Sequence, residues 1–171
     1  KPIVNKANFR NVCFGGTTEY DPDPYAVINY GGSIEHYIWY FDRDSVALKP
    51  DSNRYTTYTY GRPDLYKVRL KLVSDKNCVT TLDTNLRIHP RPQPEYQTQS
   101  ECFGDTTFFR RVLKRYPIED SMYYRWYIDY KFVKQDTAMK YLFNASGIYN
   151  VTLVGESLVG CSDSATGIVR S

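Results

Sequence analysis

Hydrophobic and polar side chains alternate along several short stretches of the chain. Between Lys67 and Val73 every second side chain is apolar, so a strand here turns residues such as Val68 and Leu72 to one face. Tyr149 and Val151 occupy the matching positions of a second alternating stretch. This period of two predicts half-buried β-strands rather than helices.

The two tryptophans lie in aromatic stretches, 37–41 and 123–128, that also predict strands. Aromatic residues make up 16% of the chain, with 17 Tyr and 8 Phe against 2 Met, and rings suit the pleated surface of a sheet. We therefore predict an all-β protein. The predicted core includes six residues: Trp39, Tyr66, Val68, Trp126, Tyr149 and Val151.

An internal repeat decides the number of domains. The stretch Cys13–Thr18 recurs as Cys102–Thr107, at an offset of 102 − 13 = 89 positions. The stretch Tyr37–Asp42 recurs as Tyr124–Asp129, at an offset of 124 − 37 = 87, so each tryptophan has the same place in its copy. The small change in offset indicates deletions in loops.

The later part of each copy follows the same order. Leu65–Leu70 matches Ile148–Leu153 at an offset of 148 − 65 = 83, and Cys78 matches Cys161. Several short strands per copy, separated by Gly, Pro, Asn and Asp, are typical of a β-sandwich. We expect two tandem immunoglobulin-like β-sandwiches.

A proline-rich linker separates the two copies. Alternate prolines in His89–Pro94 favour an extended, semi-rigid polyproline conformation. The expected domains are residues 1–90 and 91–171.

The four cysteines are matched by the repeat, and each copy holds one pair. An even number without a Cys-x-x-Cys motif favours disulfides over zinc or redox chemistry. We predict disulfides Cys13–Cys78 and Cys102–Cys161, each contributing about 4 kcal/mol by the chain-entropy argument. Buried free thiols are the alternative. Disulfides would place the protein in an oxidising compartment, extracellular or at the cell surface.

The second copy carries a longer motif, in which Tyr141 precedes Gly147, Tyr149, Val151 and Leu153. Together with the early Cys-x-Gly, the central tryptophan and the late cysteine, this order resembles the PKD family of immunoglobulin-like modules, over nearly the whole chain. It is similar in particular to the cysteine-containing versions in surface and secreted proteins of the Bacteroidota. In the first copy Asp64 replaces the glycine, and neither copy keeps the family's Gly-Asp-Gly turn after the tryptophan.

The resemblance implies a spacer or adhesive module, carried in arrays by adhesins and gliding-motility proteins that the type IX system exports. It implies no enzyme. The implied partners are other modules of the same polypeptide, and a protein or glycan on a surface. Accessory modules of an exported hydrolase, binding carbohydrate or protein, are the alternative.

Five Asp-Ser or Asp-Thr triplets resemble the O-glycosylation signal of exported Bacteroidota proteins. The candidate acceptors are Ser45, Thr106, Ser121, Thr137 and Ser164. The alternative is that these dipeptides form turns, since Asp side chains bond readily to nearby backbone groups.

Little in the sequence predicts catalysis or a cofactor. The two histidines, His36 and His89, have no matched partner that would make a catalytic constellation. Calcium is the one metal ion that the sequence suggests. Its candidate ligands are four carboxylates in the first copy: Asp21, Asp23, Asp42 and Asp44. Carboxylates that merely form turns are the alternative.

Two groups of tyrosines would suit stacking against sugars if their rings were exposed. They are Tyr55, Tyr58 and Tyr60, and Tyr123, Tyr124 and Tyr127. Strand alternation buries about half of such a set, which favours a core role. Coplanar exposed rings on one sheet face would favour sugar binding.

Charge and hydropathy exclude two classes of partner. The 22 basic and 19 acidic residues, net +3, are scattered through both copies, which does not resemble a nucleic-acid-binding surface. No apolar run approaches the roughly 18 residues that cross a bilayer, so we expect no direct membrane insertion.

Overall fold

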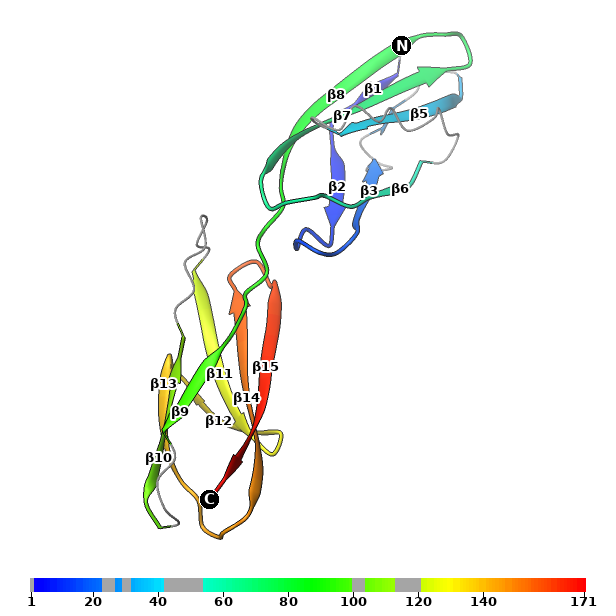
Figure 1. Ribbon diagram of the computed structural model, residues 1–171. Helices are drawn as coiled ribbons and strands as arrows, with labels where there is room; N and C mark the ends of the chain where they lie inside the picture. The colour runs from blue at the N-terminus through cyan, green and yellow to red at the C-terminus, as the bar shows by residue number, and fades with distance from the viewer. Residues whose placement is uncertain (1, 23–26, 29–31, 42–53, 100–103, 113–120) are drawn as a thin grey trace. The chain divides into compact units, whose positions relative to one another are not determined.

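The computed structural model describes residues 2–22, 27–28, 32–41, 54–99, 104–112 and 121–171. The chain divides into two compact units, Lys1–His89 and Pro90–Ser171, which we call the first and second modules. Every regular element in the described ranges is a β-strand (Figure 1). Those ranges contain no apolar helix of membrane-spanning length.

The first module contains eight strands in the described residues. They are β1 (Ile3–Val4), β2 (Ala7–Arg10), β3 (Thr18–Pro22), β4 (Val27–Ile28), β5 (Ile34–Phe41), β6 (Thr56–Tyr58), β7 (Leu65–Ser74) and β8 (Val79–Arg87). They form two three-stranded antiparallel sheets, β2-β3-β6 and β5-β7-β8, and a short pair, β1-β4.

The second module repeats this plan. Its strands are β9 (Tyr96–Gln99), β10 (Thr106–Arg111), β11 (Met122–Ile128), β12 (Lys131–Gln135), β13 (Ala138–Leu142), β14 (Ile148–Ser157) and β15 (Ser162–Arg170). The sheets are β13-β10-β9 and β12-β11-β14-β15. The orders β2-β3-β6 and β5-β7-β8 thus recur as β9-β10-β13 and β11-β14-β15, with β12 as an additional edge strand. The β1-β4 pair has no counterpart among the described residues of the second module.

Alternation along the longest strands explains how each sheet acquires a buried face. In β7 the side chains from Leu65 to Ser74 alternate between exposed and buried along most of the strand, with Leu72 fully buried. Strand β14 has the same pattern around Val151 and Leu153, which are both 0% exposed. The predicted all-β, immunoglobulin-like sandwich fold is confirmed.

The core of the first module joins its two sheets through aromatic rings. Tyr20 of β3 lies 5.4 Å from Trp39 and 4.8 Å from Phe41, both on β5, measured between ring centroids. All three side chains are at most 3% exposed. Burial of such large rings is the main source of stability in a module of this size.

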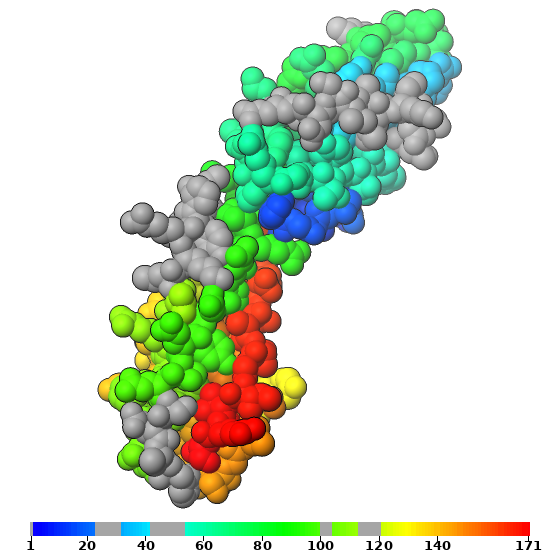
Figure 2. Space-filling view, in the orientation of Figure 1, coloured from blue at the N-terminus to red at the C-terminus, as the bar shows by residue number. Residues whose placement is uncertain are grey.

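The core of the second module is built from equivalent positions. Trp126 is fully buried, its ring centroid 5.8 Å from that of Phe109 on the opposite sheet. Its indole nitrogen donates a hydrogen bond of 3.0 Å to the Asp136 carbonyl. Tyr96 contacts the same indole ring and donates to the Val151 carbonyl at 2.9 Å, bridging the two sheets. Figure 2 shows the green surface of the segment that contains β9 beside the red surface of β15.

Of the six core residues expected from the sequence, five are buried. Tyr149 is half-buried, and its hydroxyl donates to the Ala145 carbonyl at 2.7 Å. The equivalent Tyr66 donates to the Arg62 carbonyl at 2.9 Å. Each bond ties the start of a long strand to the loop before it, like the tyrosine corner of immunoglobulin-like domains.

The hairpin after each long strand is also built alike. The Ser74 hydroxyl accepts a bond from the Cys78 amide at 3.2 Å, and the Ser157 hydroxyl accepts one from the Cys161 amide at 3.1 Å. The residue before each cysteine has positive φ, 56° at Asn77 and 85° at Gly160. Asn and Gly are the residues that enter this left-handed region most readily.

A buried tyrosine pair lies in the core of the first module. The hydroxyls of Tyr20 and Tyr60 share a hydrogen bond of 2.5 Å. Burial, followed by this hydrogen bond, raises the pKa of Tyr20 well above its usual value. The neutral phenol is therefore the form that the folded state favours.

We predict that replacing Leu153 with Ala lowers the free energy of unfolding of the second module by about 2–5 kcal/mol, because the substitution leaves a cavity in a close-packed core. Ile168→Ala on the adjacent strand is the matched control; its side chain is 68% exposed, so we expect a change within about 0.5 kcal/mol. Urea denaturation followed at the Trp126 indole signal by NMR measures both. Equal effects would contradict the assigned faces.

We predict that the first module loses stability above about pH 10, by up to about 1.4 kcal/mol per pH unit. Stability falls with rising pH because the pKa of Tyr20 is higher in the folded state than in the unfolded state. The stabilisation that the neutral phenol provides is complete below the unfolded-state pKa and is lost as the pH rises above it. Urea denaturation followed at the Leu70 and Leu72 methyl signals measures the slope. Tyr20→Phe should flatten it and the exposed Tyr55→Phe should not; a slope unchanged by Tyr20→Phe would refute the assignment.

Candidate functional site

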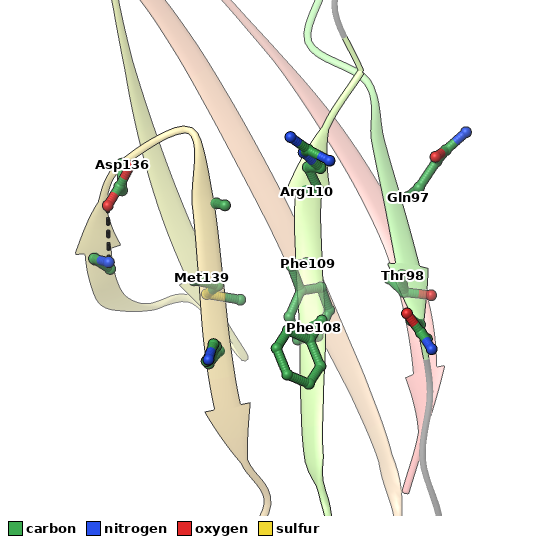
Figure 3. A pocket seen from close by; sticks show the side chains of 11 residues that line it. Gln97, Thr98, Phe108, Phe109, Arg110, Asp136 and Met139 are labelled. Carbon is green, nitrogen blue, oxygen red and sulfur yellow. Dashed lines mark ion pairs between the residues drawn. The ribbon is translucent and has the colours of Figure 1, made fainter.

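A surface hollow lies on the outer face of the second module's three-stranded sheet. This groove, which we call the Phe108 groove, has a volume of about 710 Å³. Six outward positions on β9, β10 and β13 form its floor: Gln97, Gln99, Phe108, Arg110, Ala138 and Lys140. Figure 3 shows the Phe108 ring and the Arg110 side chain on β10, with Gln97 on the neighbouring strand.

Strand register sets these side chains in two rows across the sheet. Phe108 lies opposite Gln99 on one side and Lys140 on the other. Arg110 lies between Gln97 and Ala138 in the next row. The rows are two residues apart along β10, or about 6.8 Å.

The Phe108 groove is basic. The Lys140 ammonium lies 4.9 Å from the centroid of the Phe108 ring, within range of a cation–π interaction. At one rim the Lys134 ammonium pairs with the Asp136 carboxylate at 2.8 Å. The hydrogen bond from Lys134 is the main reason that the pKa of Asp136 lies below its usual value.

The first module has a smaller hollow at the equivalent place, with a volume of about 290 Å³. We call it the Glu19 groove. Its outward positions on and beside β2, β3 and β6 are Asn8, Arg10, Glu19, Asp21, Tyr55 and Thr57. The repeat offsets pair Glu19 with Phe108 and Asp21 with Arg110, since 108 − 19 and 110 − 21 both equal 89.

The charges of the Glu19 groove are compensated within the module. Glu19 lies opposite Arg10 in the register of β2 and β3. The Asp21 carboxylate accepts a hydrogen bond of 2.9 Å from the Arg54 guanidinium. The two modules therefore carry equivalent hollows of different charge.

The tyrosines considered for sugar stacking do not form a coplanar exposed set in the structure. Tyr60 is 3% and Tyr124 is 9% exposed, so both belong to the cores. Tyr123 is 48% exposed and borders a hollow of about 270 Å³ beside Arg125. The ring of Tyr127 meets that of Phe132 at 70°, an edge contact rather than a flat platform.

Sequence reasoning missed Phe108. The signal was present: Phe108 stands between Thr107 and Phe109, which are 3% and 1% exposed, so alternation turns the Phe108 ring outward. Its exposure is 42%. The match of Glu19 with Phe108 in the repeat also marks this position as one where the two copies differ.

The predicted disulfide between Cys13 and Cys78 is wrong. Cys78 is a free thiol, whereas Cys13 is disulfide-bonded. Cys78 precedes β8 at the hairpin. Cys13 forms a parallel β-bridge with His89, which lies beyond the other end of that strand. The 89 − 78 = 11 intervening steps of extended chain span about 36 Å, whereas a disulfide needs Cα atoms about 4–7 Å apart.

In the second module, Cys161 is disulfide-bonded and 1% exposed. Cys102, its expected partner, lies outside the described residues. With Cys78 free, the remaining three of the four cysteines can form one disulfide at most, so the predicted scheme of one disulfide in each module is wrong.

The calcium prediction is not tested by the described residues. Of its four carboxylates only Asp21 is described, and there it is paired with Arg54. Asp23, Asp42 and Asp44 lie outside the described residues. Within the described ranges, no three acidic, histidine or cysteine residues cluster as metal ligands do.

The predicted O-glycosylation acceptors lie in different settings. Thr137, Ser121 and Ser164 are exposed, Thr106 is half-buried in β10, and Ser45 lies outside the described residues. The Asp136 and Asp163 carboxylates each accept a hydrogen bond from the next residue's amide, at 2.7 and 2.8 Å. These two triplets therefore also act as local turn formers.

Neither histidine lines either groove. His36 is in β5, and its Nδ1 atom is buried without a hydrogen-bond partner among the described residues. His89 exchanges backbone hydrogen bonds of 2.8 Å with Phe14 and Val12, which anchors the exit of the chain from the first module.

Comparison with known proteins establishes the fold. The chain is similar in structure to the fibronectin(III)-like modules of Clostridium thermocellum CbhA, with a TM-score of 0.55 and 6% identity over 96% of this chain and 92% of that one. No protein-family model and no curated protein matches the sequence. At this identity the similarity shows tandem sandwiches of the fibronectin III-like and immunoglobulin-like class.

Two further solved structures, of a phage protein and of a protein bound to a glycan, are less similar to this chain. The first is the outer capsid protein Hoc of bacteriophage RB49, with a TM-score of 0.41, 14% identity and 98% and 58% coverage of the two chains. The second is SGBP-B of the Bacteroides ovatus mixed-linkage glucan utilization locus, solved with a mixed-linkage heptasaccharide, with a TM-score of 0.35, 12% identity and 97% and 47% coverage. This chain spans about half the length of each.

We predict that Cys78 reacts with iodoacetamide in the native, unreduced protein, whereas Cys13 reacts only after reduction, because only Cys78 is a free thiol. Peptide mass spectrometry measures the site of alkylation. A disulfide-linked peptide joining Cys13 to Cys78 would contradict the separation of these residues along β8.

Proposed function

We propose that the chain is a pair of non-catalytic structural and adhesive modules within a larger secreted or cell-surface protein. The observation that carries this proposal is the duplication of a complete sandwich. Each module has its own core, built around Trp39 in one and Trp126 in the other. A unit that closes its own core can be repeated along a chain as a spacer, while its outer surface changes freely.

The PKD-like lineage in surface proteins of the Bacteroidota, exported by the type IX system and associated with gliding or adhesion, is part of the proposal. The family motif in the second copy supports it. Tyr149 begins a long strand with its hydroxyl bonded back to the loop, and Val151 and Leu153 of that motif are fully buried. The motif therefore serves the sandwich fold that the lineage requires.

A location outside the cytoplasm is supported by the cysteine chemistry. Cys13 is disulfide-bonded, and disulfides persist in oxidising compartments. The exposed acceptors Ser121, Thr137 and Ser164 are accessible to the O-glycosylation that the lineage would bring.

A second candidate function is that of accessory modules in an exported hydrolase. The Phe108 groove favours it, because an exposed ring flanked by amide and basic groups suits a substrate held near a catalytic domain. In that case the modules would hold a polymer, and another part of the protein would cleave it.

Replacing both modules in the parent protein, which we call the module exchange, tests the proposal. We predict that deleting residues 1–171 reduces cell adhesion. Inserting two unrelated sandwich modules of equal length in their place should keep the protein exported and restore its length, but should not restore full adhesion. Adhesion and export assays measure the two effects separately. Unchanged adhesion after deletion would refute the adhesive role. A selective loss of hydrolysis of insoluble polymer, with soluble substrate still cleaved, would favour the accessory role.

A further inference from the structure

We propose that the Phe108 groove binds an acidic polysaccharide whose sugars carry carboxylates, such as a polyuronate. This inference deepens the adhesive part of the proposed function and rests on it, because such a polymer is met outside the cytoplasm. It assigns a ligand class to one face of the second module and none to the equivalent face of the first.

The charge of the groove is the first argument. Three cations, Arg110, Lys134 and Lys140, border it with one carboxylate, Asp136, so the local balance is 3 − 1 = +2. Lys134 is paired with Asp136, which leaves Arg110 and Lys140 without an ion-pair partner among the described residues. A guanidinium and an ammonium on the rows of one sheet face attract carboxylates repeated along a chain.

The uncharged groups of the groove are the second argument. The exposed Phe108 ring offers an apolar surface at its centre. The amides of Gln97 and Gln99 on β9 offer both donors and acceptors, which suits hydroxyl groups that also donate and accept. An apolar centre with a few polar groups around it is typical of a ligand site.

The position of β10 favours a polysaccharide over an acidic peptide. An extended peptide usually binds by adding a strand to a sheet edge, through backbone hydrogen bonds. Strand β10, which carries Phe108 and Arg110, is paired with β9 on one side and β13 on the other, so its backbone is already used. Recognition across this face therefore falls to side chains, as it does for a sugar polymer.

The first module provides an internal control. At the positions of Phe108 and Arg110 it has Glu19 and Asp21, facing Arg10 and bonded to Arg54 respectively. The central position of its groove carries the Glu19 carboxylate in place of a ring, and its exposed ring, Tyr55, lies to the side, beside the edge strand β6. The same sheet face, with different side chains, is therefore expected not to bind the polymer.

Binding of polygalacturonate to the full chain tests this inference, with dextran as the neutral polymer, dextran sulfate as a non-carboxylate polyanion and poly-glutamate as the acidic peptide. We expect polygalacturonate to bind more tightly than all three, with affinity falling as salt rises. Phe108→Glu with Arg110→Asp, which installs the first module's residues, should abolish binding. Phe108→Ala and Lys140→Gln should each weaken it by roughly tenfold. The matched control Glu19→Gln should leave it unchanged.

Equal binding by the double variant and the natural chain, with thermal melting confirming that both are folded, would overturn the inference. Equal or tighter binding of poly-glutamate would assign the groove to an acidic peptide instead, and equal binding of dextran sulfate would reduce it to ion exchange. These outcomes are distinguishable from failure of the proposed function, because the module exchange reports on export and adhesion whether or not polygalacturonate binds.

Discussion

The contact between one tryptophan and the facing sheet is the interaction on which each module depends. Trp39 packs on Tyr20 and Trp126 packs on Phe109, with ring centroids 5.4 and 5.8 Å apart. A domain of this size buries a modest share of its surface, so a few large rings supply much of its stability. An inward tryptophan also decides which side chains of its strand are buried, because successive side chains of a strand point to opposite faces of the sheet.

The parts of the fold that follow from alternation were predictable from the sequence. The strands around Val68, Val151 and the two tryptophans are such parts, since their apolar positions recur with the period of a sheet. The absence of a disulfide between Cys13 and Cys78 was not predictable. Matching cysteines within a copy says nothing about the strand between them, and β8 holds those two residues at opposite ends.

The candidate site was harder to predict because it lies on outward positions that the fold leaves unconstrained. Glu19 and Phe108 occupy equivalent places on a central strand, and neither contributes to a core. The abundance of tyrosines suggested other residues for sugar binding, and some of these, such as Tyr60 and Tyr124, are buried in the cores. Comparing the two copies position by position separates what the sandwich requires from what each surface has acquired.

The central claim is that each module is a self-contained sandwich, and separate expression of residues 1–89 and 90–171 tests it most directly. The account predicts that each half gives a dispersed NMR spectrum and a cooperative unfolding transition. The Trp39 and Trp126 indole signals should show burial comparable to that in the full chain. If either half is unfolded when expressed alone, the two cores are not independent and the description of the chain as a pair of repeatable modules is contradicted.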